Sequence, residues 1–168
     1  MSSPDHLPMD PIAEARRQWA AHGWEDAADG MAAVTSLMRA HQITLARVEA
    51  VLRRYGVTFA RYEVLMLLYF SRTGALPMTK IGERLQVHPT SVTNAVDRLE
   101  SAGLVRRTAH PTDRRTTLVE LLDHGRELAV KATKELNAEV FTAPGISPEG
   151  VTLLIATLAE MRRHAGDF

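Results

Sequence analysis

Apolar residues recur at intervals of three and four along most of the chain, which predicts a mainly helical protein. Glycine and proline mark where successive helices end, and Thr58 and Ser147 are suited to cap the helices that follow them. The pattern predicts helices at about residues 12–23, 34–56, 58–73, 79–85, 89–103, 126–141 and from 147 onward. The link between the fourth and fifth helices is short, which is typical of a helix-turn-helix.

Between the fifth and sixth helices, the pattern changes to two short β-favouring stretches at 104–108 and 116–122. The segment that joins them, 110–115, is basic and rich in turn-forming residues. An isolated hairpin is only marginally stable, so it must lean on the helices before it, and its loop then projects as a wing. The fold class is therefore mainly α with a small β-wing, built around a winged helix-turn-helix.

Four segments follow from this order. Residues 1–11 form a leader rich in proline, 12–56 the N-terminal helices, 57–122 the winged helix-turn-helix, and 123–168 the C-terminal helices. The leader lacks the basic flank and apolar core of a signal peptide, and no apolar run approaches the ~20 residues that span a membrane. We therefore expect a cytoplasmic protein without a membrane partner.

Composition excludes several kinds of chemistry. The 168 residues contain no cysteine, so disulfides, thiolate zinc sites and cysteine-based redox sensing are excluded, and no clustered ligand spacing suggests another metal site. Phosphate-binding loops, nucleophile elbows and His-Glu-x-x-His motifs are absent from the sequence. We expect neither an enzyme nor a bound cofactor.

The distribution of charge points to nucleic acid. The formal net charge is zero, but residues 80–115 contain seven Lys and Arg against four acids. In the helix at 89–103, one face is apolar and the other carries side chains that reach bases and phosphates in a major groove: Thr90, Ser91, Asn94 and Arg98. His88 lies at the entrance of this helix, where it can meet a phosphate or a base. An ordinary solvated face would look similar on this helix alone.

The hairpin tip strengthens the DNA-binding hypothesis. Arg114 and Arg115 are placed to enter a narrow minor groove, whose potential favours arginine. The neighbouring acid, Asp113, is expected to hold an arginine and stiffen the turn. A winged helix that contacts only proteins is the less favoured alternative, because an arginine tip suits DNA.

Residues 58–122 resemble the MarR (multiple antibiotic resistance regulator) family. The resemblance rests on the helix-turn-helix frame, the run Arg98-Leu-Glu-Ser-Ala-Gly-Leu-Val-Arg106, and the Asp-Arg-Arg wing that precedes Leu118-Val-Glu-Leu121. It implies an intertwined homodimer through the N- and C-terminal helices, with apolar stripes at 34–55 and 151–161 as the interface. Two such stripes on a small domain also need a partner surface on physical grounds. Two recognition helices about one DNA turn apart would then contact a pseudo-palindromic operator.

The helix at 12–23 resembles an addition found in the subgroup that responds to urate and trans-aconitate. That resemblance implies a ligand-binding role for Trp19, Glu63 and Arg107, whereas the subgroup's recognition-helix arginine falls at Ala95 and is missing. His41 lies on an apolar stripe near the expected ligand pocket and is a further candidate for ligand binding. The alternatives are a core tryptophan, a structural Glu63–Arg107 ion pair and a buried, hydrogen-bonded histidine.

These features predict a transcriptional repressor that a small anionic metabolite, an organic or aromatic acid, releases from double-stranded DNA. A ligand-independent or architectural DNA-binding protein is the alternative.

Overall fold

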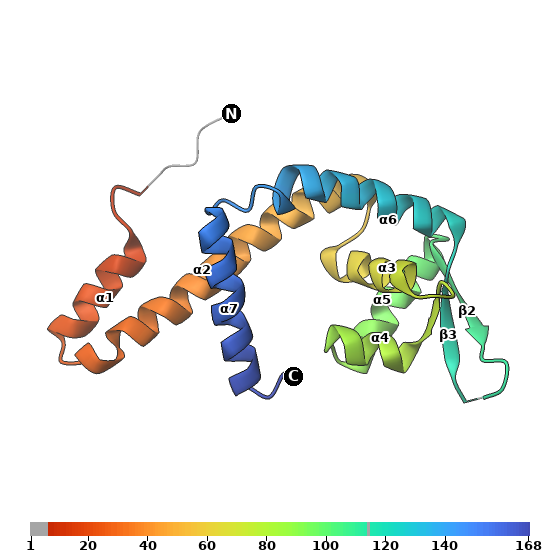
Figure 1. The fold of residues 1–168 in the computed structure, drawn as a ribbon, viewed down its shortest axis with the longest axis horizontal. Helices are drawn as coiled ribbons and strands as arrows, with labels where there is room; N and C mark the ends of the chain where they lie inside the picture. The colour runs from red at the N-terminus through yellow and green to blue at the C-terminus, as the bar shows by residue number, and fades with distance from the viewer. Residues whose placement is uncertain (1–6, 114) are drawn as a thin grey trace. The chain divides into compact units, whose positions relative to one another are not determined.

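The computed structural model describes residues 7–113 and 115–168, and the fold is mainly helical with a small sheet, as predicted (Figure 1). The helices are α1 (Pro11–Ala21), α2 (Glu25–Leu52), α3 (Phe59–Phe70), α4 (Met78–Leu85), α5 (Pro89–Ser101), α6 (Asp123–Leu136) and α7 (Pro148–His164). The strands are β1 (Ala75–Pro77), β2 (Val105–Ala109) and β3 (Thr117–Leu121). A 3-10 turn, η1 (Arg53–Tyr55), ends α2, and a π-helical segment, η2 (Asn137–Phe141), ends α6. The chain forms two compact units, Met1–Arg47 and Val48–Phe168, with α2 running from the first into the second.

Side-chain caps fix where several helices begin. The hydroxyl of Thr58 accepts a hydrogen bond from the N–H of Arg61 at 3.4 Å, and that of Ser147 accepts one from the N–H of Gly150 at 3.1 Å. Each cap satisfies one of the backbone donors that a helix N-terminus leaves free. The caps predicted at Thr58 and Ser147 are therefore confirmed. Asp10 does the same for α1 by accepting from the N–H of Ile12 at 2.9 Å.

Two helices begin earlier than the sequence pattern indicated. The second helix starts at Glu25 rather than near Val34, because the alanine-rich turns before Val34 favour a helix without contributing to the apolar stripe. The sixth helix starts at Asp123 rather than near Arg126, directly after β3. The N–H of Leu122 donates to the carbonyl of Leu104 at 3.1 Å and ties the start of this helix to the beginning of the hairpin.

The sheet has three strands rather than the two predicted. It is antiparallel with the order β1-β3-β2, so β3 lies in the middle, with Val119 opposite Leu76 on one side and opposite Arg107 on the other. The strand that the sequence analysis missed, β1, is three residues long and ends in Pro77. It supplies the support that an isolated hairpin needs, and it anchors the wing to the helix-turn-helix.

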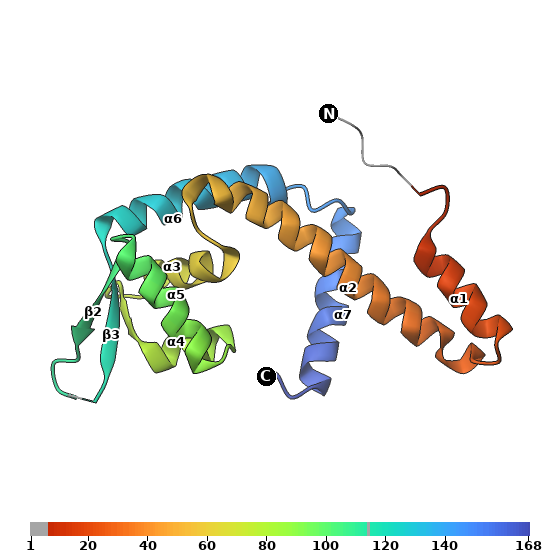
Figure 2. The ribbon, with the colours of Figure 1, turned by 180° about the vertical axis from the view of Figure 1, so that it is seen from behind.

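A single apolar core lies within the unit Val48–Phe168. It joins residues of α3, α5, α6 and the sheet, and its largest fully buried side chains include Leu52, Leu65, Leu68, Ile81, Leu99 and Leu136. Figures 1 and 2 show α3, α4 and α5 gathered beside the sheet, with α6 crossing over them. Burial of α5 in this core fixes which of its faces remains outside.

Polar contacts join the remaining elements of this unit. Arg54, at the end of α2, forms ion pairs with Glu135 at 3.0 Å and Glu139 at 2.5 Å. The side chain of Gln86, at the turn between α4 and α5, donates to the carbonyl of Asp167 at 2.7 Å. The segment that follows α7 therefore touches the helix-turn-helix.

Within the described ranges, no helix is both long and apolar enough to cross a membrane. The same residues contain no group of three or more His, Cys, Asp or Glu side chains that would hold a metal ion.

Candidate nucleic-acid interface

The helix α5 begins directly after the short turn that follows α4. Pro89 occupies its first position, where the missing N–H costs no hydrogen bond, and the Nδ1 atom of His88 accepts from the N–H of Thr90 at 3.2 Å. His88 therefore caps the helix while remaining exposed. The turn before it depends on Gln86, which adopts a left-handed conformation with φ of 53°.

One face of α5 is buried and the opposite face is open. Val92, Val96 and Leu99 lie in the core. The predicted contact residues Thr90, Ser91, Asn94 and Arg98 are all exposed. In the part of the chain that the structure describes, the side chains of Ser91, Asn94 and Arg98 have no hydrogen-bond or ion-pair partner. Their donors and acceptors are free for a ligand.

A cleft of about 710 Å³ lies between this open face and the start of α3. It brings Arg61 of α3, which the sequence analysis did not single out, to the same cavity as Arg98. The lining residues are Thr58, Ala60, Arg61, Ser91, Asn94, Ala95, Asp97, Arg98 and Ser101. Because Arg61 is far from α5 in sequence, only the packing of the two helices reveals this second guanidinium.

The tip of the hairpin is stiffened by Asp113. Its carboxylate accepts from the N–H of Arg115 at 3.0 Å and from the hydroxyl of Thr116 at 2.6 Å. These hydrogen bonds, that from Thr116 first, hold the pKa of Asp113 below its usual value. These contacts are consistent with the predicted role in stiffening the turn, and among the described residues Asp113 binds the backbone of Arg115.

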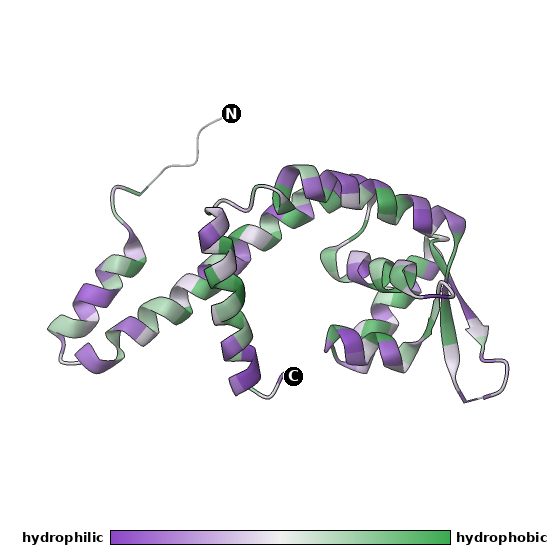
Figure 3. Ribbon diagram, in the orientation of Figure 1, coloured by the Kyte–Doolittle hydropathy of each residue, from purple (hydrophilic) through white to green (hydrophobic). Residues whose placement is uncertain are grey.

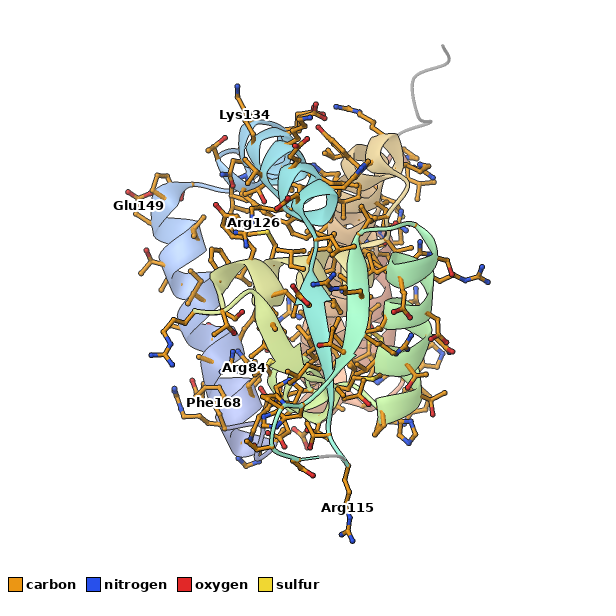
Figure 4. All side chains as sticks on the ribbon, turned by 90° about the vertical axis from the view of Figure 1, so that its right-hand side faces the viewer. Arg84, Arg115, Arg126, Lys134, Glu149 and Phe168 are labelled. Atoms are coloured by element: carbon orange, nitrogen blue, oxygen red, sulfur yellow. The ribbon has the colours of Figure 1, made fainter. Side chains whose placement is uncertain are left out.

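The side chain of Arg115 extends away from the protein at the end of the wing (Figure 4). Arg114, predicted to act with it, lies outside the described residues. The open face of α5 and the side chain of Arg115 thus belong to one unit of the structure, joined through the sheet.

Arg107 does not form the ion pair with Glu63 that was considered from the sequence. Its guanidinium binds Glu100 and Asp97 of α5, each at 2.5 Å, and its backbone N–H donates to Glu100 at 2.7 Å. The backbone N–H of Arg107, followed by its guanidinium, holds the pKa of Glu100 below its usual value. Strand β2 lies directly beside α5, so the acids that bind Arg107 come from α5 and not from α3.

Glu63 is half-buried on α3 and has no hydrogen-bond or ion-pair partner among the described residues. Burial raises the pKa of its carboxyl above the usual value, because the charged form loses water without gaining a partner. The folded state therefore binds a proton at this site more readily than the unfolded state does.

We expect Glu63→Gln to stabilise the protein near neutral pH. An acid with a raised folded pKa costs stability above its unfolded pKa, so the gain should be present at pH 7.5 and shrink as the pH falls toward about 4.3. Thermal unfolding should show an increase of less than about 3 °C at pH 7.5, since the side chain is only half-buried. The exposed Glu127 provides the control, because Glu127→Gln relieves no burial. Equal gains at both positions, or a gain independent of pH, would contradict this assignment.

The other two predicted ligand residues lie in the N-terminal unit, and both differ from the structural alternatives considered. Trp19 is half-buried and packs edge-on against Trp24, with ring centroids 5.2 Å apart, and α1 has no fully buried residue. Trp19 does not belong to the buried core of the single chain. His41 is exposed on α2 rather than buried, because the apolar stripe around it is itself exposed in the single chain.

Comparison with known proteins identifies the family. The model of the MarR family matches residues 57–117. The structure resembles that of Sco5413, a MarR family transcriptional regulator from Streptomyces coelicolor, with 51% identity and a TM-score of 0.76, over 83% of this chain and 97% of that one. The chain belongs to the MarR family.

Two further proteins extend the comparison. YdgJ of Bacillus subtilis (strain 168), an uncharacterized HTH-type transcriptional regulator, is 35% identical over 104 residues, which make up 60% of this chain and 61% of YdgJ. The chain thus aligns with less than two thirds of this curated relative. The structure of Sco3205, a MarR family transcriptional regulator from Streptomyces coelicolor in complex with DNA, has the same fold, with 24% identity and a TM-score of 0.66, over 98% of this chain and 92% of that one.

Proposed function

We propose that this MarR-family protein is a transcriptional regulator that binds double-stranded DNA in a sequence-specific manner. The observation that carries the proposal is the open face of α5, where Ser91, Asn94 and Arg98 are exposed and without partners in the described structure. The amide of Asn94 and the guanidinium of Arg98 are suited to hydrogen-bond with base edges in a major groove. The exposed Arg115 suits the adjacent minor groove. The DNA complex of Sco3205 gives this use of the fold a precedent.

We propose that the active form is a homodimer that binds a pseudo-palindromic operator. Hydrophobic residues recur along α7 (Figure 3). Among them, Leu153 is 68% exposed and Ile155 is 65% exposed in the single chain. On α2, Met38 is 65% exposed, which leaves a second apolar stripe open. Exposed patches of this kind mark association surfaces, and a two-fold dimer covers the same stripes on both copies. A solution mass of twice 18.6 kDa is expected.

The finer proposal is repression relieved by a small anionic metabolite, an organic or aromatic acid. The cleft beside α5 supports it, because Arg61 and Arg98 bring two positive charges to a cavity next to the proposed DNA-binding face. The resemblance to the urate and trans-aconitate subgroup adds Trp19, Glu63 and Arg107 as candidate ligand contacts, and His41 is a further candidate from its place on the apolar stripe of α2. Such a ligand acts only if it binds the DNA-free form more tightly than the DNA-bound form. A regulator without a ligand is the alternative.

The test is a titration of the protein on the DNA upstream of its own gene. Binding is measured at two salt concentrations, with scrambled DNA as the control and with citrate, trans-aconitate, urate and aromatic acids added in turn. Tight binding that prefers the upstream DNA and weakens with salt is expected, because phosphate contacts release counterions. Equal binding to scrambled DNA would reject sequence specificity, and binding that no acid relieves would favour the ligand-independent alternative.

A further inference from the structure

Three hydrogen bonds hold Arg107 of the wing strand against the recognition helix α5. Its backbone N–H donates to Glu100 Oε1 at 2.7 Å, one guanidinium nitrogen donates to Glu100 Oε2 at 2.5 Å, and another donates to Asp97 Oδ1 at 2.5 Å. The Arg107 side chain is only 27% exposed, against 54% for Asp97 and 38% for Glu100. We call these three residues the Arg107 clamp.

The two acids of the clamp lie near the open face of α5, which is proposed to contact DNA. Asp97 and Glu100 are three residues apart, so they are neighbours on one helix face. Asp97 also lines the same cleft as Asn94 and Arg98, the side chains proposed to meet DNA. Unpaired carboxylates at this place would repel phosphates, and a negative patch would weaken every contact around it.

We propose that Arg107 is a positioning residue for DNA recognition. Its guanidinium offsets one of the two negative charges of Asp97 and Glu100, and its bonds hold α5 in a fixed orientation relative to strand β2. Strand β2 leads to the wing that carries Arg115. The clamp therefore fixes α5 relative to the wing, so that the side chains of α5 and Arg115 can contact the same DNA duplex. This inference rests on the proposed DNA binding and assigns to Arg107 a role that needs no metabolite.

The geometry requires an arginine. A planar guanidinium donates to two acceptors at once, whereas a lysine ammonium carries the same charge without the fork. The backbone N–H of Arg107 also binds Glu100 and does not depend on the side chain. A substitution of Arg107 therefore leaves Glu100 close to its place, and the expected effects come from the lost guanidinium.

The experiment compares four proteins by DNA affinity at two salt concentrations, with thermal unfolding to verify that each is folded. Arg107→Met should bind the upstream DNA about 10- to 100-fold more weakly than wild type, and the loss should be larger at low salt, where repulsion is less screened. Adding Asp97→Asn and Glu100→Gln to Arg107→Met should restore affinity to within about threefold of wild type, since the repelling charges are gone. Arg107→Lys should fall between Arg107→Met and wild type.

The outcomes separate this inference from the proposed function. If wild type binds the DNA and Arg107→Met binds it equally well, the clamp has no role in recognition. If the triple variant is no better than Arg107→Met, the lost affinity does not come from the acids, and a direct contact of Arg107 with DNA replaces the inference. If wild type itself does not bind, the proposed function fails.

A readout without DNA tests the positioning directly. Amide hydrogen exchange in α5 should be faster in Arg107→Met than in wild type, because the helix loses the hydrogen bonds from the Arg107 guanidinium that join it to the sheet. Unchanged protection in α5 would overturn the positioning role, whatever the DNA affinity.

Discussion

A protein carrying Gly125→Ala is expected to unfold at a temperature about 6–12 °C below that of the wild type, if it folds at all. Gly125 lies in the first turn of α6, where the chain passes directly beside the end of α5 and the start of β2. A Cβ atom at this position would collide with the carbonyl oxygen of Leu104, and it would lie 3.0 Å from the carbonyl carbon of Leu104 and 2.9 Å from Leu121 Cδ1. Backbone atoms cannot yield as a flexible side chain does, so overpacking here should cost about 3 kcal/mol.

Gly30 provides the matched control for this substitution. It lies inside α2, and a Cβ atom there would have nothing within 4 Å. Gly30→Ala should therefore stabilise the helix by up to about 1 kcal/mol, since alanine has the higher helix propensity. Thermal unfolding of the two variants should move in opposite directions. A Gly125→Ala protein as stable as wild type would show that the close approach of α6 to Leu104 is not maintained in solution.

Arg115→Ala should weaken binding to the upstream DNA by about 1–3 kcal/mol, which is about 5- to 150-fold. The side chain extends from a turn that Asp113 stiffens through the backbone of Arg115 itself. The backbone at such a tip loses little further freedom when the arginine enters a minor groove, and the narrow groove's potential favours the guanidinium. The variant should also show a smaller dependence of affinity on salt, because one cation fewer is brought to the DNA.

Lys134→Ala is the control for a general loss of positive charge. Lys134 is exposed near the end of α6, and in Figure 4 it points away from the protein at the opposite side from Arg115. Lys134→Ala removes the same unit of charge as Arg115→Ala. Equal losses of DNA affinity in the two variants would mean that overall charge, and not the wing, governs binding. An Arg115→Ala protein that binds like wild type would remove the wing from the interface.

Local signals in the sequence were sufficient to predict the helices and several of their ends. The caps at Thr58 and Ser147 act within one turn of the chain, so residue type and spacing determine them. The strand β1 could not be found in this way. Three residues ending in Pro77 have little intrinsic preference for a strand, and they form one only because β3 lies beside them.

The same distinction applies to the candidate site. The exposed face of α5 follows from helical periodicity, since burial of Val92, Val96 and Leu99 turns Asn94 and Arg98 outward. The partners of Arg107 and the arrival of Arg61 at the cleft depend on how separate elements pack. From the sequence, an ion pair of Arg107 with Glu63 was one alternative, and the packing of β2 beside α5 gives Arg107 the partners Glu100 and Asp97 instead.

The three-stranded sheet has a consequence for behaviour at high concentration. A small open sheet offers its outer strands to other chains, and edge-to-edge pairing is a route to aggregation. At one edge, Pro77 has no N–H to donate and the carbonyl of Ala75 already accepts from the hydroxyl of Thr73 at 3.2 Å. At the other edge, the N–H of Arg107 is engaged by a carboxylate of α5. Each outer strand thus has at least one backbone group that is missing or engaged within the same chain, which disfavours the addition of a foreign strand.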